Sequence, residues 1–371
     1  MDKQHLITEL QSHGLKLVEQ EVGAAGRKGG AGPSDHKAVT IEGTTVMVPI
    51  FTGTAARSPY TAKLDSGAGS QTLHLQEEAI APISFPQQPK FYGLATAEGI
   101  PYWKIALLHS QDVLATTVLQ TCMRYIDTES ACQFCAIGQS LEAGRTIARK
   151  LPAQLAEVAE AAVRLDGVKH MIMTTGTPNT TDRGAAYLTE CVRVVKQRVD
   201  LPIQVQCEPP DDFIWFDRLK AAGVDSLGMH LEAVDPAVRD RIMPGKATVP
   251  VEFYFQAFEA AVQVFGWGQV STYLLAGLGD SLETLVEASD RLIQIGVYPF
   301  VVPFVPISGT PLAAQPAPSS EFMYSLYQQV SALLNRAGMS SAAMKAGCGK
   351  CGACSALSTF EQPTPTKALN L

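Results

Sequence analysis

An apolar strand runs directly into a group of three cysteines in VLATTVLQTCMRYIDTESACQFCAIG, residues 113–138. The β-branched residues at its start predict a buried strand. Cys122, Cys132 and Cys135 follow, and Phe134 directly precedes the last of them. Thiolates on a short loop after a buried strand are good ligands for soft metals. The segment therefore predicts a metal site at the carboxyl end of a strand.

Apolar segments that read as strands alternate with segments of helical spacing from this point onward. The expected strands cover residues 113–121, 170–175, 202–207, 226–231, 270–277 and 297–304. The expected helices cover residues 150–165, 184–198, 213–223, 253–266, 282–296 and 321–336. Continuous apolar strands with intervening helices indicate a parallel sheet covered on both faces. Six such units fit a partial (β/α)6 barrel or an open doubly wound sheet, and in both the active site lies beyond the carboxyl ends of the strands.

The residues before this alternation predict a small β-rich N-terminal region. Residues 39–51 predict a β-hairpin that turns at Glu42-Gly43, and residues 91–109 suggest a second that turns near Glu98-Gly99. The glycine-rich stretch Gly23–Asp35 predicts a loop between them and the N-terminus. We expect an N-terminal region over 1–110, a barrel over 111–337 and a cysteine-containing tail over 338–371, whose polar end frays.

Composition and charge narrow the class of protein. The 371 residues include 36 acidic and 29 basic side chains, a net charge of −7, and 46% are hydrophobic. An acidic chain lacks the basic face that nucleic-acid binding needs. The first ten residues do not resemble a signal peptide, and the apolar run at 300–307 is short and broken by two prolines. We expect a soluble cytoplasmic protein with no nucleic-acid or membrane partner.

The number of cysteines in the first group separates two kinds of metal site. Structural zinc sites are closed by four ligands. The nearest histidine, His109, precedes the strand and so lies at its other end. An iron–sulfur cluster held by three cysteines leaves one iron open for another ligand. Zinc stays the alternative to the cluster.

At this point the chain resembles the radical S-adenosylmethionine (SAM) superfamily, in which the first strand of a partial barrel precedes a cysteine triad with an aromatic residue, here Phe134, before its last cysteine. The resemblance implies a [4Fe-4S] cluster on Cys122, Cys132 and Cys135, which are the catalytic and metal-binding residues. The open iron would bind SAM, and an electron from a donor such as flavodoxin or ferredoxin would cleave it to methionine and a 5′-deoxyadenosyl radical. The common triad is CxxxCxxC, whereas this one is Cx9CxxC, so the first gap departs from the family pattern.

The same resemblance assigns further strand ends to SAM. Thr175, Gly176 and Thr177 would hold its amino group, Glu208 would contact it after the third strand, and Ile137 would lie with Phe134 at the adenine. The remaining predicted cofactor-binding residues are His230, Glu232, Arg241 and Gly277. Structural alternatives are a turn at 174–177, a helix-terminal charge at Glu208, a buried His–Glu pair, a tight packing point at Gly277 and solvated charges at Arg241 and Lys246.

A second group of cysteines, Cys348, Cys351 and Cys354, lies in CGKCGAC near the end of the chain. The CxxCxxC spacing matches part of the bacterial ferredoxin run and predicts a second iron–sulfur cluster. That cluster would transfer electrons, bind substrate or donate sulfur, and its fourth ligand would be a distant residue, solvent or substrate. Zinc is again the alternative. Cys191 is expected to be a buried hydrophobic residue, and Cys207 to be buried or to face the barrel cavity.

A closer resemblance covers several segments, among them residues 131–141, 230–235 and 269–280. They look like a radical SAM family encoded beside nitrilase, acetyltransferase and flavoprotein genes in a bacterial cluster associated with cyanide assimilation, whose enzymes are candidate partners. More distantly, the barrel is similar to biotin synthase and lipoyl synthase. We therefore expect a radical SAM enzyme that acts on a small molecule by sulfur insertion, oxidation or rearrangement, in a cavity closed below by the N-terminal region or the tail. The competing hypotheses are a zinc-stabilised binding module and a non-catalytic subunit of a larger assembly.

Overall fold

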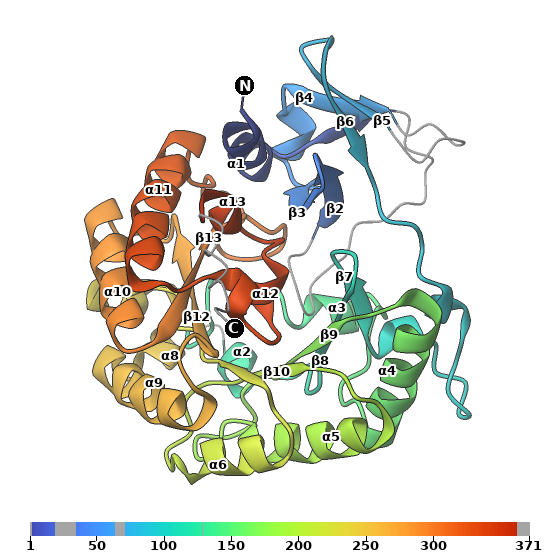
Figure 1. Ribbon diagram of the computed structural model, residues 1–371, viewed down its shortest axis with the longest axis vertical. Helices are drawn as coiled ribbons and strands as arrows, with labels where there is room; N and C mark the ends of the chain where they lie inside the picture. The colour runs from blue at the N-terminus through green and yellow to red at the C-terminus, as the bar shows by residue number, and fades with distance from the viewer. Residues whose placement is uncertain (1, 19–34, 64–70, 128, 362–371) are drawn as a thin grey trace, which may run out of the picture.

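The strands that the structure describes form two separate sheets, and the larger one curls into most of a barrel (Figure 1). A computed structural model describes residues 2–18, 35–63, 71–127 and 129–361. The predicted glycine-rich loop lies outside these residues apart from Asp35, and so does the polar end of the tail beyond residue 361.

The larger sheet has seven strands within the described residues, in the order β13-β12-β11-β10-β9-β8-β7. From β8 to β13 each strand runs parallel to the next one in the chain, while β7 pairs antiparallel with β8 at one edge. The bounds are β7 (Leu107–His109), β8 (Val113–Thr117), β9 (His170–Thr174), β10 (Ile203–Gln206), β11 (Ser226–Gly228), β12 (Val270–Ala276) and β13 (Val297–Pro303). This order confirms the predicted partial (β/α)6 barrel.

Helices cover the outside of the curled sheet (Figure 1). The long ones are α4 (Pro152–Asp166), α5 (Ala185–Arg198), α6 (Ile214–Ala221), α9 (Val251–Phe265), α10 (Leu282–Gln294) and α11 (Ser320–Ala337). Short helices follow several strand ends: α2 (Met123–Ile126), α3 (Gln139–Glu142), α7 (Pro236–Ile242) and α8 (Pro244–Ala247). Cover on both faces explains why β8, β10 and β13 are buried along their whole length.

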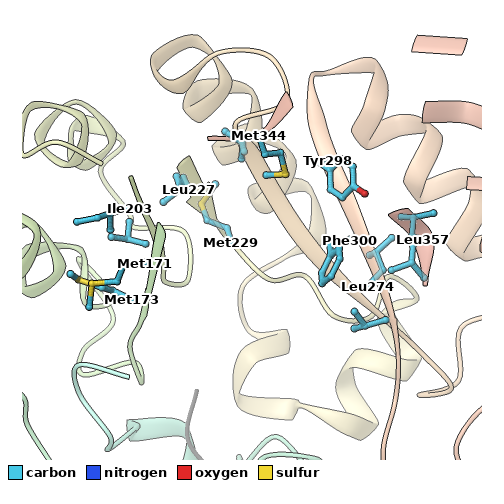
Figure 2. Close-up of a cluster of buried hydrophobic side chains, with 14 of the residues drawn as sticks. Met171, Met173, Ile203, Leu227, Met229, Leu274, Tyr298, Phe300, Met344 and Leu357 are labelled. Carbon is cyan, nitrogen blue, oxygen red and sulfur yellow. The ribbon is translucent and has the colours of Figure 1, made fainter. Parts of the chain in front are cut away.

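Successive side chains of a barrel strand point alternately to the hydrophobic core and to the barrel interior. Met171 and Met173 of β9 belong to the core, where Figure 2 shows them in one cluster with Ile203 and Leu227 of the neighbouring strands. The residues between and after them on β9, at 172 and 174, line the interior cavity instead. This division follows from the two-residue period of a strand.

The N-terminal region forms the second sheet, in the order β1-β4-β5-β6-β2-β3. Its elements are α1 (Lys3–His13), β1 (Lys16–Val18), β2 (His36–Ile41), β3 (Thr44–Pro49), β4 (Tyr60–Lys63), β5 (Gln71–Leu75) and β6 (Glu78–Ser84). The β2–β3 hairpin turns at Glu42-Gly43 as predicted, with positive φ angles of 46° and 76° at the two residues. Such a pair of angles suits the tight turn of a two-residue hairpin.

The prediction of a second hairpin over residues 91–109 was wrong. Within that span the structure has two 3-10 turns, Lys90–Gly93 and Tyr102–Lys104, and one antiparallel bridge between Ala95 and Pro101. A proline has no N–H to donate to a ladder, so pairing does not extend past the bridge. The end of the span, β7, instead joins the barrel sheet. The boundary between the N-terminal region and the barrel at residue 110 therefore stays a prediction.

The tail folds back into the barrel. Its short helices are α12 (Cys348–Cys351) and α13 (Leu357–Phe360), preceded by a 3-10 turn at Ser341–Ala343, and Figure 1 draws α12 within the curl of the larger sheet. The Met47 N–H of β3 donates to the Ala353 carbonyl at 2.7 Å, and the Ser355 hydroxyl donates to the Val301 carbonyl of β13 at 2.6 Å. The tail thus lies between the N-terminal sheet and the barrel strands.

Candidate functional site

A cavity of about 420 Å³ occupies the barrel interior. Its walls come from β8, β9, β10, β12 and β13 and from the loops that follow several of these strands. Gln11, His36 and Met47 of the N-terminal region and Cys348 and Cys354 of the tail also line it. Both the N-terminal region and the tail therefore border the cavity, whereas the sequence analysis expected one or the other to close it.

The first cysteine group lies together on the wall of this cavity. Cys122, Cys132 and Cys135 all line it, as do Phe134 and Ile137. The loop that carries them is held by hydrogen bonds from Met123 N to the Thr177 carbonyl at 2.8 Å and from Gln133 N to the Ile242 carbonyl at 2.8 Å. Burial raises the pKa of the Cys135 thiol to about 12 and that of Cys132 above its ordinary value.

The loop after β9 packs directly against the first cysteine. Gly176 N donates to the Leu119 carbonyl at 2.9 Å, and a Cβ atom at Gly176 would lie only 2.2 Å from the Thr121 carbonyl oxygen and 3.1 Å from the Cys122 Cβ. Only a residue without a side chain fits at this contact. The predicted residues Thr175, Gly176 and Thr177 all line the cavity beside Cys122.

Glu208 connects three parts of the site. Its two carboxylate oxygens accept hydrogen bonds from Nε and Nη2 of Arg124, each at 2.7 Å, and Oε1 also accepts from the Thr177 hydroxyl at 2.7 Å. Burial alone would raise the pKa of Glu208, but the hydrogen bonds from Arg124 and the charge of Lys246 hold it below its usual value. The carboxylate is therefore ionised and already bound on both oxygens.

Lys246 and Glu232 form a second buried ion pair at the cavity. Lys246 Nζ lies 2.8 Å from Glu232 Oε2, and the two side chains are 9% and 15% exposed. Burial would lower the pKa of Lys246, yet the charge of Glu232 raises it, so the ammonium persists. Glu232 has a φ of 68°, which is uncommon for a residue with a side chain. Lys246 is thus neither a solvated charge nor unpaired.

His230 is neutral and held by its neighbours. Its ring stacks on Tyr273 with 4.2 Å between centroids, and Nδ1 accepts a hydrogen bond from the Tyr273 N–H at 3.3 Å. Burial, with the charge of Lys246, lowers the pKa of His230 to about 3. His230 and Glu232 both line the cavity, but each has its own partner, so the His–Glu pair that the sequence suggested does not form.

Two predicted residues lie away from the cavity wall. Arg241 Nη2 donates to the Leu278 carbonyl at 3.1 Å, and Gly277 has a φ of 101° and accepts a hydrogen bond from Gln315 at 2.5 Å. A Cβ at Gly277 would meet Pro318 Cδ at 2.9 Å. Neither residue is among those that line the cavity. Arg241 is an exposed residue of α7, whereas Gly277 is closely packed in the loop that follows β12.

The second cysteine group borders the same cavity from the tail. Cys348 and Cys354 line it, and Cys351 packs beside Ala38 and Met47 of the N-terminal hairpin. Cys348 Sγ accepts a hydrogen bond from Gln206 Nε2 at 3.1 Å, and Cys354 Sγ lies 3.4 Å from His109 Nε2. Burial raises the pKa of Cys351 to about 12.

The two groups lie toward opposite ends of the strands. Cys122 follows the carboxyl end of β8, whereas His109, beside Cys354, pairs with Val113 at the amino end of β8. Among the residues that the structure describes, no three histidine, cysteine or acidic side chains converge as the ligands of a single ion would. A cluster does not require that convergence, because each thiolate binds a different iron. The thiols of each cysteine group therefore suit an iron–sulfur cluster at its end of the barrel strands.

Sequence reasoning missed three residues of this site. Arg124 follows the first cysteine by two positions, and nothing in its neighbourhood indicated that it would reach Glu208. Tyr273 was treated only as part of an apolar strand, although it lines the cavity beside His230. Gln206 shares the end of β10 with Cys207, which is buried and also lines the cavity.

Cys191 is buried in α5, as predicted. No helix in the described part of the chain is long and apolar enough to cross a membrane.

Comparisons with known proteins find similarity over part of the chain. Residues 128–292 match the family model of the radical SAM superfamily. A bacteriochlorophyllide c C-7(1)-hydroxylase from Chlorobaculum limnaeum is 32% identical over 136 residues, which are 36% of this chain and 34% of the relative. A mitochondrial lipoyl synthase from Clavispora lusitaniae is 30% identical over 194 residues, 50% of this chain and 45% of the relative.

These matches span about a third to a half of the length of the curated relatives. Among solved structures, methylornithine synthase is similar with a TM-score of 0.48 and 15% identity, over 76% of this chain and 86% of that one. The matched family segment contains Cys132 and Cys135 and the strands from β9 to β12. Residues 128–292 therefore carry the similarity to the radical SAM superfamily.

Proposed function

We propose that the protein is an enzyme that holds a [4Fe-4S] cluster on Cys122, Cys132 and Cys135 and reductively cleaves SAM bound to the open iron. The observation that carries the proposal is that the thiol-bearing residues Cys122, Cys132 and Cys135 all line the barrel cavity. When bound, the cluster and SAM supply the reactive species, since one electron splits SAM into methionine and a 5′-deoxyadenosyl radical. The protein supplies position and the exclusion of water.

In this proposal, the residues beside the first cysteine group each have a different role in binding SAM. Thr175, Gly176 and Thr177 bring backbone groups to the side of Cys122, and Phe134 and Ile137 border the adenine. Glu208 acts through its neighbours, because its oxygens are taken by Arg124 and Thr177. It fixes the Thr177 hydroxyl and the loop that follows Cys122.

The charged side chains that line the described cavity favour an uncharged substrate. Arg124 is paired with Glu208, and Lys246 with Glu232. His230 is neutral because burial lowers its pKa to about 3. A net charge on the substrate would therefore meet no unpaired partner among these groups, and a buried unpaired charge is costly.

The tail cysteines support a second iron–sulfur cluster in this proposal. Cys348 and Cys354 line the same cavity as the first group, so the substrate would lie between the two sites. This arrangement favours chemistry in which the second cluster exchanges electrons with the substrate, binds it or donates sulfur to it. We further propose that flavodoxin or ferredoxin supplies the electron, and that enzymes of the nitrilase-containing gene cluster are partners.

Cleavage of SAM by the isolated protein tests the proposal. Wild type, Cys135→Ala and Cys191→Ala are purified without oxygen, reconstituted with iron and sulfide, and reduced with dithionite. We expect 5′-deoxyadenosine from wild type and from Cys191→Ala, whose thiol is buried in α5, and at least a hundredfold less from Cys135→Ala. Equal product from Cys135→Ala would remove that cysteine from the ligand set. A colourless wild type that holds zinc and yields no product would favour the zinc-stabilised module instead.

A further inference from the structure

We propose that side chains around the second cysteine group donate hydrogen bonds to its sulfurs and thereby give the second iron–sulfur cluster a higher reduction potential than the first, so that it accepts an electron from the substrate. This role rests on the second cluster of the proposed function and selects one of the three roles left open there. The donors act through the cysteines and are therefore positioning residues: Gln206, Tyr273, Ser110 and His109.

Cys348 receives two of these hydrogen bonds. Gln206 Nε2 donates to Cys348 Sγ at 3.1 Å, and the Tyr273 hydroxyl donates to the same sulfur. Both donors line the barrel cavity. Burial raises the pKa of the Cys348 thiol, and the two hydrogen bonds oppose that rise because each of them stabilises the thiolate. Burial also raises the pKa of Tyr273, so its hydroxyl keeps the proton that it donates.

A buried hydrogen-bond network fixes the orientation of the Gln206 amide. The Cys348 N–H can only donate, so the Gln204 atom that lies 3.2 Å from it is the oxygen Oε1. The same oxygen lies 2.8 Å from the Gln206 amide, which must therefore present its NH2 group. That NH2 group has a second N–H, which is the donor to Cys348 Sγ. Gln204 and Gln206 are 0% and 5% exposed, so the network is shielded from bulk water.

The other two cysteines of the tail have side-chain donors as well. His109 Nε2 lies within hydrogen-bond distance of Cys354 Sγ, at 3.4 Å. A thiolate bound to iron carries no proton, so in the loaded site the imidazole is the donor. Burial raises the pKa of the Cys351 thiol to about 12, and a hydrogen bond from the Ser110 hydroxyl opposes that rise. His109 ends β7 and Ser110 follows it, so one segment serves both sulfurs.

The first cysteine group differs in this respect. Within the part of the chain that the structure describes, no side chain donates a hydrogen bond to the sulfur of Cys122, Cys132 or Cys135. All six cysteines of the two groups are partly buried, so burial does not separate them. The cavity-lining cations Arg124 and Lys246 are each paired with a carboxylate and add no net charge. The side-chain donors thus distinguish the second group from the first.

Hydrogen bonds to the sulfurs are one of the factors that set the reduction potential of an iron–sulfur cluster. Reduction adds a negative charge, and a donor aimed at a sulfur stabilises the more negative form more strongly. The second cluster should therefore take up an electron more readily than the first. After hydrogen abstraction, the substrate radical would lose one electron to this cluster and one proton to water, which completes a two-electron oxidation. The electron would then pass back to the flavodoxin or ferredoxin.

Reduction potentials measured on the full chain test this assignment. One triple variant keeps only the tail group and the other keeps only the first group: Cys122→Ala/Cys132→Ala/Cys135→Ala and Cys348→Ala/Cys351→Ala/Cys354→Ala. Both are reconstituted with iron and sulfide and titrated without SAM, and the reduced cluster is followed by electron paramagnetic resonance. We expect a less negative midpoint potential for the cluster of the tail than for the first cluster.

Substitutions of the donors in the variant that keeps the tail test the cause. Tyr273→Phe removes one hydroxyl and keeps the ring that stacks on His230, so it separates the hydrogen bond from packing. Tyr273→Phe and Gln206→Met should each make the midpoint potential more negative at an unchanged iron content, and the double variant should shift it further. Tyr254→Phe is the matched control, because Tyr254 is also buried but does not line the cavity, and its potential should equal that of the parent.

The possible outcomes separate the parts of the proposal. An unchanged potential in Tyr273→Phe, even if Gln206→Met loses its iron, would overturn the role of the donors, and so would an equal shift in Tyr254→Phe. A tail potential equal to or more negative than that of the first cluster would overturn the role as electron acceptor and leave the second cluster in place. A tail variant without iron would overturn the second cluster itself, and the SAM-cleavage test of the first cluster would be unaffected.

Discussion

Arg124 and Glu208 join the cysteine loop to the third barrel strand through two parallel hydrogen bonds, Nε to Oε1 and Nη2 to Oε2, both 2.7 Å long. The side chains are 9% and 7% exposed. A bidentate pair of this kind fixes orientation as well as distance. The end of β10 thereby helps to position the loop that begins at Cys122.

Glu208→Gln should weaken this connection. The variant leaves Arg124 buried without its counter-charge, so we expect a loss of about 3–5 kcal/mol in the free energy of unfolding. SAM should also bind more weakly, because the Thr177 hydroxyl loses a fixed acceptor. Urea unfolding and equilibrium dialysis with SAM measure the two effects. Glu252→Gln breaks the exposed Arg291 pair and should cost less than about 1 kcal/mol; equal losses in the two variants would refute the structural role of Glu208.

Gly176→Ala should disturb the first cysteine group selectively. The new Cβ would overlap the Thr121 carbonyl oxygen, so the loop after β9 must move away from Cys122. We expect a loss of stability of about 1–3 kcal/mol and a lower iron content at the first site. Gly93→Ala is the matched control, since nothing lies within 4 Å of its Cβ position. Iron analysis of both proteins measures how far the first site is loaded. A fully loaded first site in Gly176→Ala would contradict the close contact between Gly176 and Thr121.

Lys246→Met should destabilise the protein by leaving Glu232 buried and unpaired. The expected loss is about 3–5 kcal/mol in the free energy of unfolding, and the double variant Lys246→Met/Glu232→Gln should regain part of it. Chemical denaturation measures both. Arg198→Met, which breaks the exposed pair with Glu160, should change stability by less than about 1 kcal/mol. No recovery in the double variant would mean that the two charges act independently.

Stability should fall as the pH drops below about 6.5, in part through His170. Burial, with the charge of Lys350, lowers the pKa of His170 to about 4. The unfolded histidine takes up a proton near pH 6.5, whereas the folded one does so only near pH 4, so acid favours the unfolded chain in this window. Between pH 7 and pH 5 this amounts to about 2 kcal/mol.

His170→Gln removes that titration and keeps an acceptor for the Gly347 N–H. Denaturation curves at the two pH values should therefore differ by about 2 kcal/mol less in the variant than in wild type. Identical pH dependence in the two proteins would show that the folded His170 protonates as easily as the unfolded one.

The barrel could be predicted from the sequence because its strands are buried on both faces. Residues such as Met171 and Val297 stand in continuous apolar runs, and the helical spacing between the strands is equally regular. The hairpin at Glu42-Gly43 was predictable because Gly43 readily adopts the positive φ that a tight turn needs. The segment that ends at β7 was not, because its partner strand, β8, belongs to the other sheet.

The partners of the charged residues could not be predicted in this way. Arg124 and Glu208 are separated by 84 positions and carry no shared motif. A solvated charge was the alternative considered for Lys246, and only the fold brings it to Glu232. His109 was correctly placed at the far end of the strand from the first cysteines, but the path of the tail that brings Cys354 to it depends on packing between the two sheets.

Iron and acid-labile sulfide per chain test the central claim, that two cysteine groups at opposite ends of one cavity each hold a cluster. They are measured after anaerobic reconstitution on wild type, on Cys122→Ala/Cys132→Ala/Cys135→Ala and on Cys348→Ala/Cys351→Ala/Cys354→Ala. We predict about eight irons in wild type and about four in each variant, as for two cubane clusters. Zinc in place of iron in wild type, or iron that both variants retain in full, would contradict the claim.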